Sequence, residues 1–278
     1  MQPTTAKLER AKAAHSGTKR YLFSNIPPLD LLDRVSMVTV AAGVRRIGVL
    51  EGDGVQVGQI RDALGNRGIV TSTSNAVWTI RHLETTSDDR LSLLHSMRSE
   101  EPKRQSVLWL FDDADARREV KGKQISKALA GHLLGYPPCC VQANEQSGLD
   151  LDIRFLDALT AKVGSDLNAI RQALMDDVGV DMDESGAGVE NVAATTAKFP
   201  FVSHVCCDSC LVDIDSPSSR LNAQFDALTK EVAPDLHEAV LTMTALVSQL
   251  DSTDNPSRIF DEADRIHRKL LPDVPLSR

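Results

Sequence analysis

Val107-Leu108-Trp109-Leu110-Phe111 is an unbroken apolar run that Asp112-Asp113 brings to an end. Five apolar residues followed by a polar pair predict a buried strand. Shorter apolar runs at 46–50 and 68–71 predict two more strands, and the segments between the three have the apolar spacing of helices, at 55–64 and 87–99. A chain that alternates strand and helix is typical of a parallel sheet. We therefore expect an α/β N-terminal part with a small parallel sheet, preceded by a helix over 29–43 that Gly43 closes.

After residue 115 the apolar spacing becomes helical throughout. It predicts one long helix over 116–134, two helices within 151–178 divided near Gly164-Ser165, and a loop over 179–198 rich in small residues. Three more helices are expected to begin at Ser216-Pro217, Pro234 and Asn255-Pro256. The C-terminal part is thus expected to be mainly α-helical. The domain prediction is a polar N-terminal arm (1–25), a small α/β domain (26–115) and a helical cysteine-motif domain (116–278).

Charge and hydropathy exclude several classes of function. The net charge is −8, and residues 151–250 hold six basic against sixteen acidic side chains, which argues against nucleic acid as a partner. The basic residues near the N-terminus, such as Lys7 and Arg10, are interpreted as a solvated or frayed arm. No apolar run reaches the length of a membrane span, and the first 20 residues lack the apolar centre of a secretory signal. We therefore expect a cytoplasmic protein without a membrane partner.

All five cysteines fall in two short motifs, Gly135-Tyr136-Pro137-Pro138-Cys139-Cys140 and His204-Val205-Cys206-Cys207-Asp208-Ser209-Cys210. In a reducing compartment, clustered thiols indicate metal binding or catalysis rather than disulfides. Thiolate is also the ligand that zinc and iron–sulfur centres prefer. The motifs therefore predict a metal centre. The alternative, five buried but inert thiols, would not by itself gather all of them into two motifs.

The prolines of the first motif suit the first turn of a helix, which would place Cys139 and Cys140 beside free N–H groups that favour thiolates. Consecutive side chains diverge, so one member of each Cys-Cys pair is expected to be the ligand. Candidate metal ligands are Cys139, Cys140, Cys206, Cys207, Cys210 and His204. Three or four thiolates suit a 4Fe-4S cluster or zinc. Only one motif has a C-x-x-C-like form, which places the 4Fe-4S cluster first and zinc second.

The two motifs resemble those of an uncharacterised prokaryotic domain family that carries G-Y-P-x-C-C and, farther on, H-x-P-C-S-x-x-C. The resemblance covers roughly residues 105–230, and the first motif matches fully. In the second motif, Val205 stands near the family's proline and Cys207 near its serine. The resemblance implies that Cys139, Cys140, Cys206 and Cys210 are the core cofactor-binding set and that Cys207 is peculiar to this chain. It implies no reaction.

These observations predict a cytoplasmic metalloprotein, with a 4Fe-4S-dependent lyase, dehydratase or sulfur-transfer enzyme as the leading hypothesis. A cluster held by three cysteines leaves one iron open to a small-molecule substrate. His204 and Asp208 are the candidate catalytic residues, and Arg45-Arg46 or Arg117-Arg118 could bind an anionic substrate. Asp112, Asp113 and Asp115 are interpreted as turn and helix-capping residues. The alternative hypothesis is a zinc-stabilised binding or scaffold protein without catalysis.

Overall fold

The apolar run at 107–111 lies in the central strand of a three-stranded sheet. The computed structural model describes residues 3–18, 28–52, 54–74, 88–100, 106–121, 127–176, 178–180, 189–250 and 265. Strands β1 (Ile47–Gly52), β2 (Val70–Ser74) and β3 (Ser106–Phe111) follow the order β1-β3-β2. Both outer strands run antiparallel to β3, with Ile47 and Val70 each opposite Phe111. The predicted parallel sheet is therefore wrong, although the three strands are where the sequence indicates.

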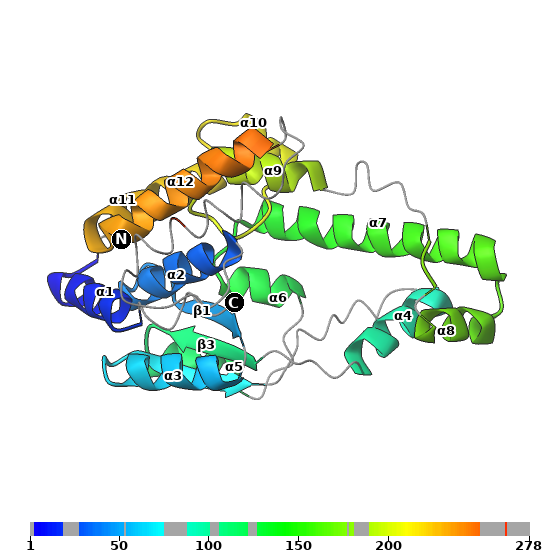
Figure 1. Ribbon diagram of the computed structural model, residues 1–278, viewed down its shortest axis with the longest axis horizontal. Coiled ribbons are helices and arrows are strands. Elements are labelled where there is room, and N and C mark those ends of the chain that lie inside the picture. Colours follow the sequence, from blue (N-terminus) through cyan, green and yellow to red (C-terminus); the bar gives the residue numbers. More distant parts are fainter. Residues whose placement is uncertain are drawn as a thin grey trace.

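The course of the chain after β2 explains the antiparallel pairing. Helix α3 (Gly54–Gly65) contacts all three strands, as the helix of a crossover connection does. Helix α4 (Asp89–Glu100) would have to pack on the sheet in the same way for β3 to run parallel to β2. Its contacts are instead with helices α7 (Pro138–Val163) and α8 (Leu167–Met175), on the far side of the molecule (Figure 1). The alternation of strand and helix in the sequence does not indicate that α4 packs away from the sheet.

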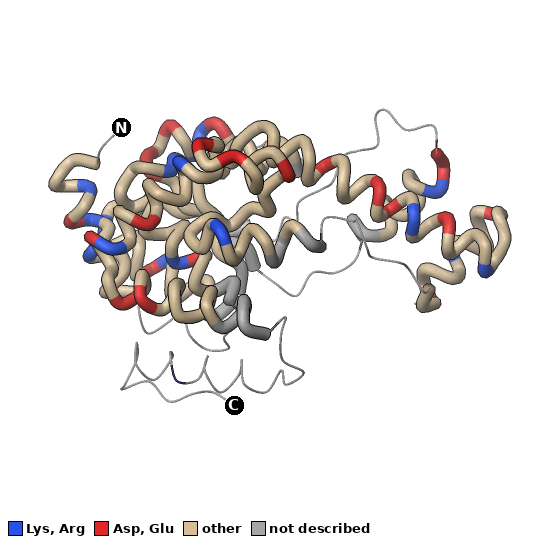
Figure 2. The backbone as a smooth tube through the Cα atoms, turned by 90° about the horizontal axis from the view of Figure 1, so that it is seen from above, with Lys and Arg blue, Asp and Glu red and all other residues tan. Residues whose placement is uncertain are grey.

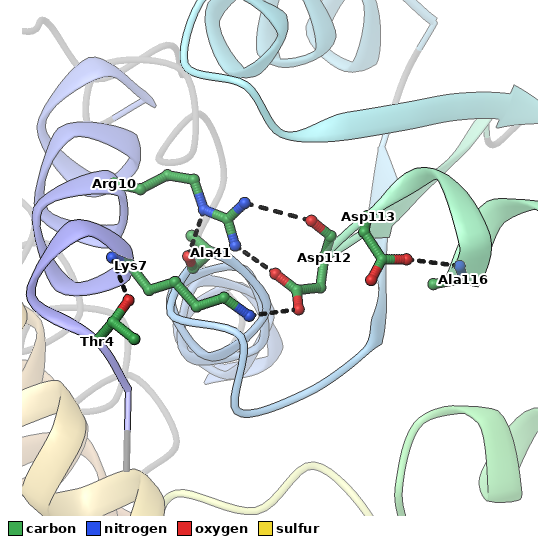
Figure 3. A network of polar contacts seen from close by, with 7 residues as sticks. All are labelled: Thr4, Lys7, Arg10, Ala41, Asp112, Asp113 and Ala116. Carbon is green, nitrogen blue, oxygen red and sulfur yellow. Dashed lines mark hydrogen bonds and ion pairs between the residues drawn. The ribbon is translucent and has the colours of Figure 1, made fainter. Parts of the chain in front are cut away.

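The segment predicted to be a solvated arm contains a packed helix. Helix α1 (Thr5–Thr18) buries Ala11 and Ala14 against α2 (Pro28–Ala41). Two basic side chains of α1 reach the end of β3, where Lys7 Nζ lies 2.8 Å from Asp112 Oδ2 and Arg10 pairs with Asp112 Oδ1 (Figure 3). Helix α1 is thus held by small residues on its buried face and by ion pairs at the edge of that face. The basic charge of the segment, from which a solvated arm is expected, does not indicate this packing.

The rest of the described chain is mainly helical, as predicted, but three boundaries differ. Helix α7 begins at Pro138 and not within the expected range 151–178. The expected single helix over 116–134 is two helices, α5 (Ala114–Val120) and α6 (Lys127–Leu133), because Lys121 leaves the helical conformation with ψ 123°. The expected loop over 179–198 contains α9 (Val189–Lys198). The predicted starts at Pro217 and Pro234 are confirmed. The last predicted helix lies outside the described residues apart from residue 265. The remaining elements are α10 (Asp208–Val212), α11 (Pro217–Val232) and α12 (Pro234–Leu250).

Two separate hydrophobic clusters lie along α7. The main cluster contains residues of α1, α2, the sheet, α11 and α12, together with Cys140, Cys206, Cys207 and Cys210. It takes residues from both sides of the boundary predicted near residue 115, and that boundary stays a prediction. The outer cluster joins the far end of α7 to α4 and α8 through residues such as Leu94, Leu156 and Ile170. Figure 1 shows α7 extending from the main body to this outer group.

Charged residues of both signs are interspersed over most of the described backbone (Figure 2). Within the same residues, none of the helices combines the length and the apolar character of a membrane span. Asp113 accepts a hydrogen bond from the Ala116 N–H at 2.8 Å and caps α5, which confirms its predicted role.

Candidate metal centre

The first cysteine motif forms the turn between α6 and α7. Gly135 has φ 74°, and the N–H groups of Gly135 and Tyr136 donate to the carbonyls of His132 and Gly131. A glycine with positive φ after the last helical residue is a common way for a helix to end. Pro137 then caps α7 and Pro138 occupies its first turn, which places Cys139 and Cys140 at the helix N-terminus. The prediction of a proline-initiated helix carrying both thiols is confirmed.

The second motif presents two of its thiols through a short helix. Cys207 is the N-cap residue of α10, with an extended backbone at φ −73° and ψ 161°, and Cys210 follows in the first turn. An N-cap residue and the residue three positions on lie on the same side of a helix start. The side chains of Cys207 and Cys210 therefore converge. Cys206 precedes the cap, and its backbone N–H donates to Thr195 Oγ1 at 2.8 Å.

The two motifs meet in a four-thiol group made of Cys139, Cys140, Cys207 and Cys210. The four sulfurs all lie within 4.8 Å of one another. Cys139 Sγ is 3.6 Å from Cys210 Sγ, and Cys140 Sγ is 3.7 Å from Cys207 Sγ. Cys139 is exposed and the other three residues are buried. This arrangement can hold a metal ion, in agreement with the prediction of a metalloprotein.

A second group shares Cys140 with the first. Cys140, His204 and Cys206, the histidine group, also have their ligand atoms within 4.8 Å of one another, and all three residues are buried. His204 Nε2 lies 3.6 Å from Cys206 Sγ and 3.0 Å from Ser218 Oγ. Ser218 Oγ is in turn 3.4 Å from Cys140 Sγ. Ser218 thus completes a compact set of four side chains, and the sequence carries no signal that points to it.

Hydrogen bonds fasten the two motifs to each other. Asn144, one turn after Cys140 on α7, donates through Nδ2 to the carbonyls of Cys140 at 2.9 Å and of Val205 at 2.6 Å. The Tyr136 and Ser203 hydroxyls lie 2.9 Å apart. The backbone N–H of Cys207 points at Cys140 Sγ at 3.4 Å. An N–H group aimed at a sulfur is the kind of contact that orients and stabilises a thiolate ligand.

The thiols differ in how readily they ionise. A hydrogen bond with Cys206, followed by burial, raises the pKa of Cys140 to about 11. Desolvation and the contact with Cys210 raise the pKa of Cys139 to about 12, although part of that residue is exposed. Burial also opposes ionisation of Cys207, but hydrogen bonds with the Ser209 hydroxyl and the Cys210 N–H outweigh it and lower its pKa to about 7. The bond with Cys140 lowers the pKa of Cys206. Closely spaced thiols cannot all ionise unless a cation neutralises them.

The other predicted site residues lie apart from the two groups. Asp208 is exposed on α10 and accepts a hydrogen bond from Asn191 Nδ2 at 2.8 Å. Its catalytic role stays a prediction. Arg117 and Arg118 form an exposed face of α5. The cofactor set implied by the family resemblance differs from the geometric grouping, which puts Cys207 among the four thiols and Cys206 beside His204.

Arg45 is the predicted anion-binding residue that lies nearest to this region. It is 5 % exposed, and Nη1 donates to Ser36 Oγ at 3.1 Å. Its guanidinium carbon lies 4.6 Å from the centre of the Phe225 ring and 5.3 Å from that of Tyr136. The Tyr136 ring is 4.8 Å from the His204 ring. Nε and Nη2 of Arg45 are buried and have no hydrogen-bond partner among the described residues, and burial lowers the pKa of this side chain.

Comparison of the chain with protein-family models, with curated proteins and with solved structures finds no match. The resemblance to a cysteine-motif family stays a prediction.

Proposed function

We propose that this chain is a zinc-stabilised protein in which the four-thiol group holds one tetrahedral metal ion. The observation that carries the proposal is the mutual proximity of four thiols from two motifs about 70 residues apart, with sulfur–sulfur distances of 3.6 and 3.7 Å. A tetrahedral zinc ion with Zn–S bonds of about 2.3 Å sets its sulfurs about 3.8 Å apart. Four protein ligands close the coordination sphere, which is the usual form of a structural zinc site.

The spacing of the sulfurs supports a single ion over a 4Fe-4S cluster. In a cubane cluster each cysteine binds a different iron, so the four thiolates stand around the whole cluster and lie much farther apart than four thiolates on one ion. The lyase, dehydratase or sulfur-transfer activity predicted from the sequence depends on such a cluster. It therefore ranks behind the zinc-stabilised scaffold, and the experiment below separates the two.

The position of the group indicates what the ion would contribute. Cys139 and Cys140 begin α7, while Cys207 and Cys210 begin α10, and three of the four belong to the main hydrophobic cluster. An ion bound there would cross-link segments that the chain brings together only on folding. Its binding free energy would then form part of the folding free energy. When bound, the ion would also neutralise thiolates that repel one another.

The test is elemental analysis of the full chain, purified without oxygen and with a thiol reductant. We expect zinc and no acid-labile sulfide. Cys207→Ser and Cys210→Ser should each remove one ion per chain. Asp208→Asn is the matched control, because Asp208 lies between these cysteines but belongs to neither group, and it should keep the metal content of the parent protein. Iron with an equal amount of sulfide would replace this proposal by the iron–sulfur hypothesis, and a metal-free protein would refute both.

A further inference from the structure

We infer that the histidine group is a second metal site and that Cys140 bridges its ion to the ion of the four-thiol group. The inference rests on the proposed function, because Cys140 is common to both sites. It predicts a binuclear, thiolate-bridged centre for divalent ions such as Zn²⁺ or Co²⁺. The ligands of the second ion are Cys140 Sγ, Cys206 Sγ and His204 Nε2, and the fourth position faces Ser218 Oγ.

The distances within the group agree with one tetrahedral ion. With metal–sulfur bonds of about 2.3 Å and metal–nitrogen bonds of about 2.0 Å, tetrahedral coordination separates sulfur from nitrogen or oxygen by about 3.5 Å. Cys206 Sγ and His204 Nε2 are 3.6 Å apart, and Cys140 Sγ and Ser218 Oγ are 3.4 Å apart. A cluster of thiols that only form hydrogen bonds with one another would not need a histidine nitrogen at the distance expected for a metal ligand. Two thiolates and an imidazole are, by contrast, a common zinc ligand set.

Burial and charge give an independent reason for a second ion. His204, Cys206 and Ser218 are 6 %, 1 % and 0 % exposed, so any charge on them is shielded from water. One divalent ion bound by four thiolates leaves a net charge of minus two at the edge of the hydrophobic core. A second divalent ion with one further thiolate and a neutral imidazole reduces this to minus one. Buried charge is costly unless it is compensated, so the second ion is favoured once the first is bound.

The fold holds the histidine group in place from several elements. Thr195 Oγ1 of α9 accepts a hydrogen bond from the Cys206 N–H. Ser218 lies in the first turn of α11, and the Tyr136 ring packs against the His204 ring. Sites whose ligands are fixed by such contacts bind metal with little rearrangement. The fourth coordination position of the second ion faces a neutral hydroxyl, whereas all four positions of the ion in the four-thiol group are taken by cysteine sulfurs. Three protein ligands and one exchangeable position characterise reactive rather than structural zinc ions.

The experiment is a Co²⁺ titration of the reduced, metal-free full chain, with metal content and the electron paramagnetic resonance signal measured at each step. The parent protein should bind two Co²⁺ ions. The electron paramagnetic resonance signal of the first high-spin Co²⁺ should decrease as the second ion binds, because the shared Cys140 sulfur couples the electron spins of the two ions. Cys206→Ser and His204→Gln should each lose one of the two ions and keep the full uncoupled signal. The ion retained in the four-thiol group shows that these variants are folded, and Asp208→Asn should behave as the parent.

The outcomes distinguish this inference from the proposed function. If the parent saturates with one ion and Cys206→Ser retains it, the second site is refuted while the four-thiol site stands. If the parent binds one ion and Cys206→Ser loses it, the ion belongs to the histidine group and both proposals are overturned. If two ions bind without any coupling of their signals, Cys140 is not a bridge and the inference is wrong in its central feature.

Discussion

Cys206 and Cys207 are neighbours in the chain, but their side chains serve different groups. The extended backbone at the N-cap of α10 directs Cys207 toward Cys210 and Cys140. Cys206 lies one residue earlier on the opposite side, beside His204. Alternation of side chains along an extended segment accounts for the division. A Cys-Cys pair at a helix cap can therefore supply two adjacent metal sites.

The raised pKa values of two thiols predict how the stability of the metal-free protein depends on pH. Folding raises the pKa of Cys139 and Cys140 from 9.0 to about 12 and about 11. The unfolded chain therefore loses these protons first, so their contribution to stability is complete below pH 9 and disappears as the pH rises to about 11 for Cys140 and about 12 for Cys139. The pKa of Cys207 is lowered to about 7, so the contribution of this thiol to stability increases as the pH rises from 7 to 9.

We expect the unfolding free energy of the reduced, chelator-treated protein to decrease between pH 9 and 11, measured by urea denaturation at each pH. Cys139→Ala removes one of the responsible thiols and should flatten the decrease. Equal slopes for the parent and Cys139→Ala would show that Cys139 is not destabilised as a thiolate in the folded state.

The fold also alters the chemistry of Arg45, because burial lowers the pKa of its guanidinium. The buried guanidinium, with two nitrogens that have no hydrogen-bond partner within the described part of the chain, loses hydration that its contacts with Phe225 and Tyr136 replace only in part. Arg45→Met keeps most of the side-chain volume and removes the charge, so we expect its unfolding free energy to stay within about 1 kcal/mol of the parent value. Arg45→Ala leaves a cavity and should lose about 2–4 kcal/mol.

Urea denaturation of both Arg45 variants gives the comparison. A large loss in Arg45→Met, similar to that in Arg45→Ala, would mean that the charge itself is stabilising. The contacts of the guanidinium with the Phe225 and Tyr136 rings would then outweigh its loss of hydration.

At the scale of elements, the turn between α6 and α7 sets the position of the first motif. Gly135 adopts φ 74°, and a side-chain carbon at this position would meet no atom of the described residues within 4 Å. The backbone conformation alone therefore requires glycine here. A left-handed conformation costs a residue with a side chain about 1–2 kcal/mol. Gly58, inside α3, has equally open surroundings but no such conformation.

This pair of glycines gives a matched prediction. Gly135→Ala should lower the unfolding free energy by about 1–2 kcal/mol, whereas Gly58→Ala should raise it by about 0.5–1 kcal/mol because alanine favours the helix. Thermal unfolding of the metal-bound protein measures both changes. A neutral or stabilising Gly135→Ala would contradict the conformation of this turn and, with it, the placement of Cys139 and Cys140.

Local signals predicted the elements well and their assembly poorly. The proline pair before Cys139 and the capping residues at Asp113 and Ser216 act through their nearest neighbours, so the sequence reveals them. The direction of β3 depends on α4 packing with α7 and α8, and the ligand grouping depends on Ser218 and Thr195 arriving from other helices. Such long-range contacts have no periodicity in the sequence from which they could be recognised.

At the scale of the whole molecule, α7 connects two hydrophobic clusters that are built from different elements. The main cluster includes three residues of the four-thiol group, whereas the outer cluster is built from α4, α8 and the distal half of α7. A buried contact between His95 Nε2 and Asp152 Oδ2 at 2.9 Å joins α4 to α7 within the outer part. Clusters that share few contacts commonly open as separate units.

The two clusters should therefore respond independently in a hydrogen-exchange experiment. Removing the metal should accelerate amide exchange at the start of α7 and in α10 and α11, because the cross-link there is lost, and leave α4 and α8 unchanged. Leu156→Ala, which opens a cavity in the outer cluster at a cost of about 2–5 kcal/mol, should have the reverse effect. It should accelerate exchange in α4 and α8 without lowering the metal content. If chelation and Leu156→Ala both accelerate exchange throughout the chain, the molecule unfolds as one cooperative unit. The ion would then stabilise the whole protein rather than the part in which it is bound.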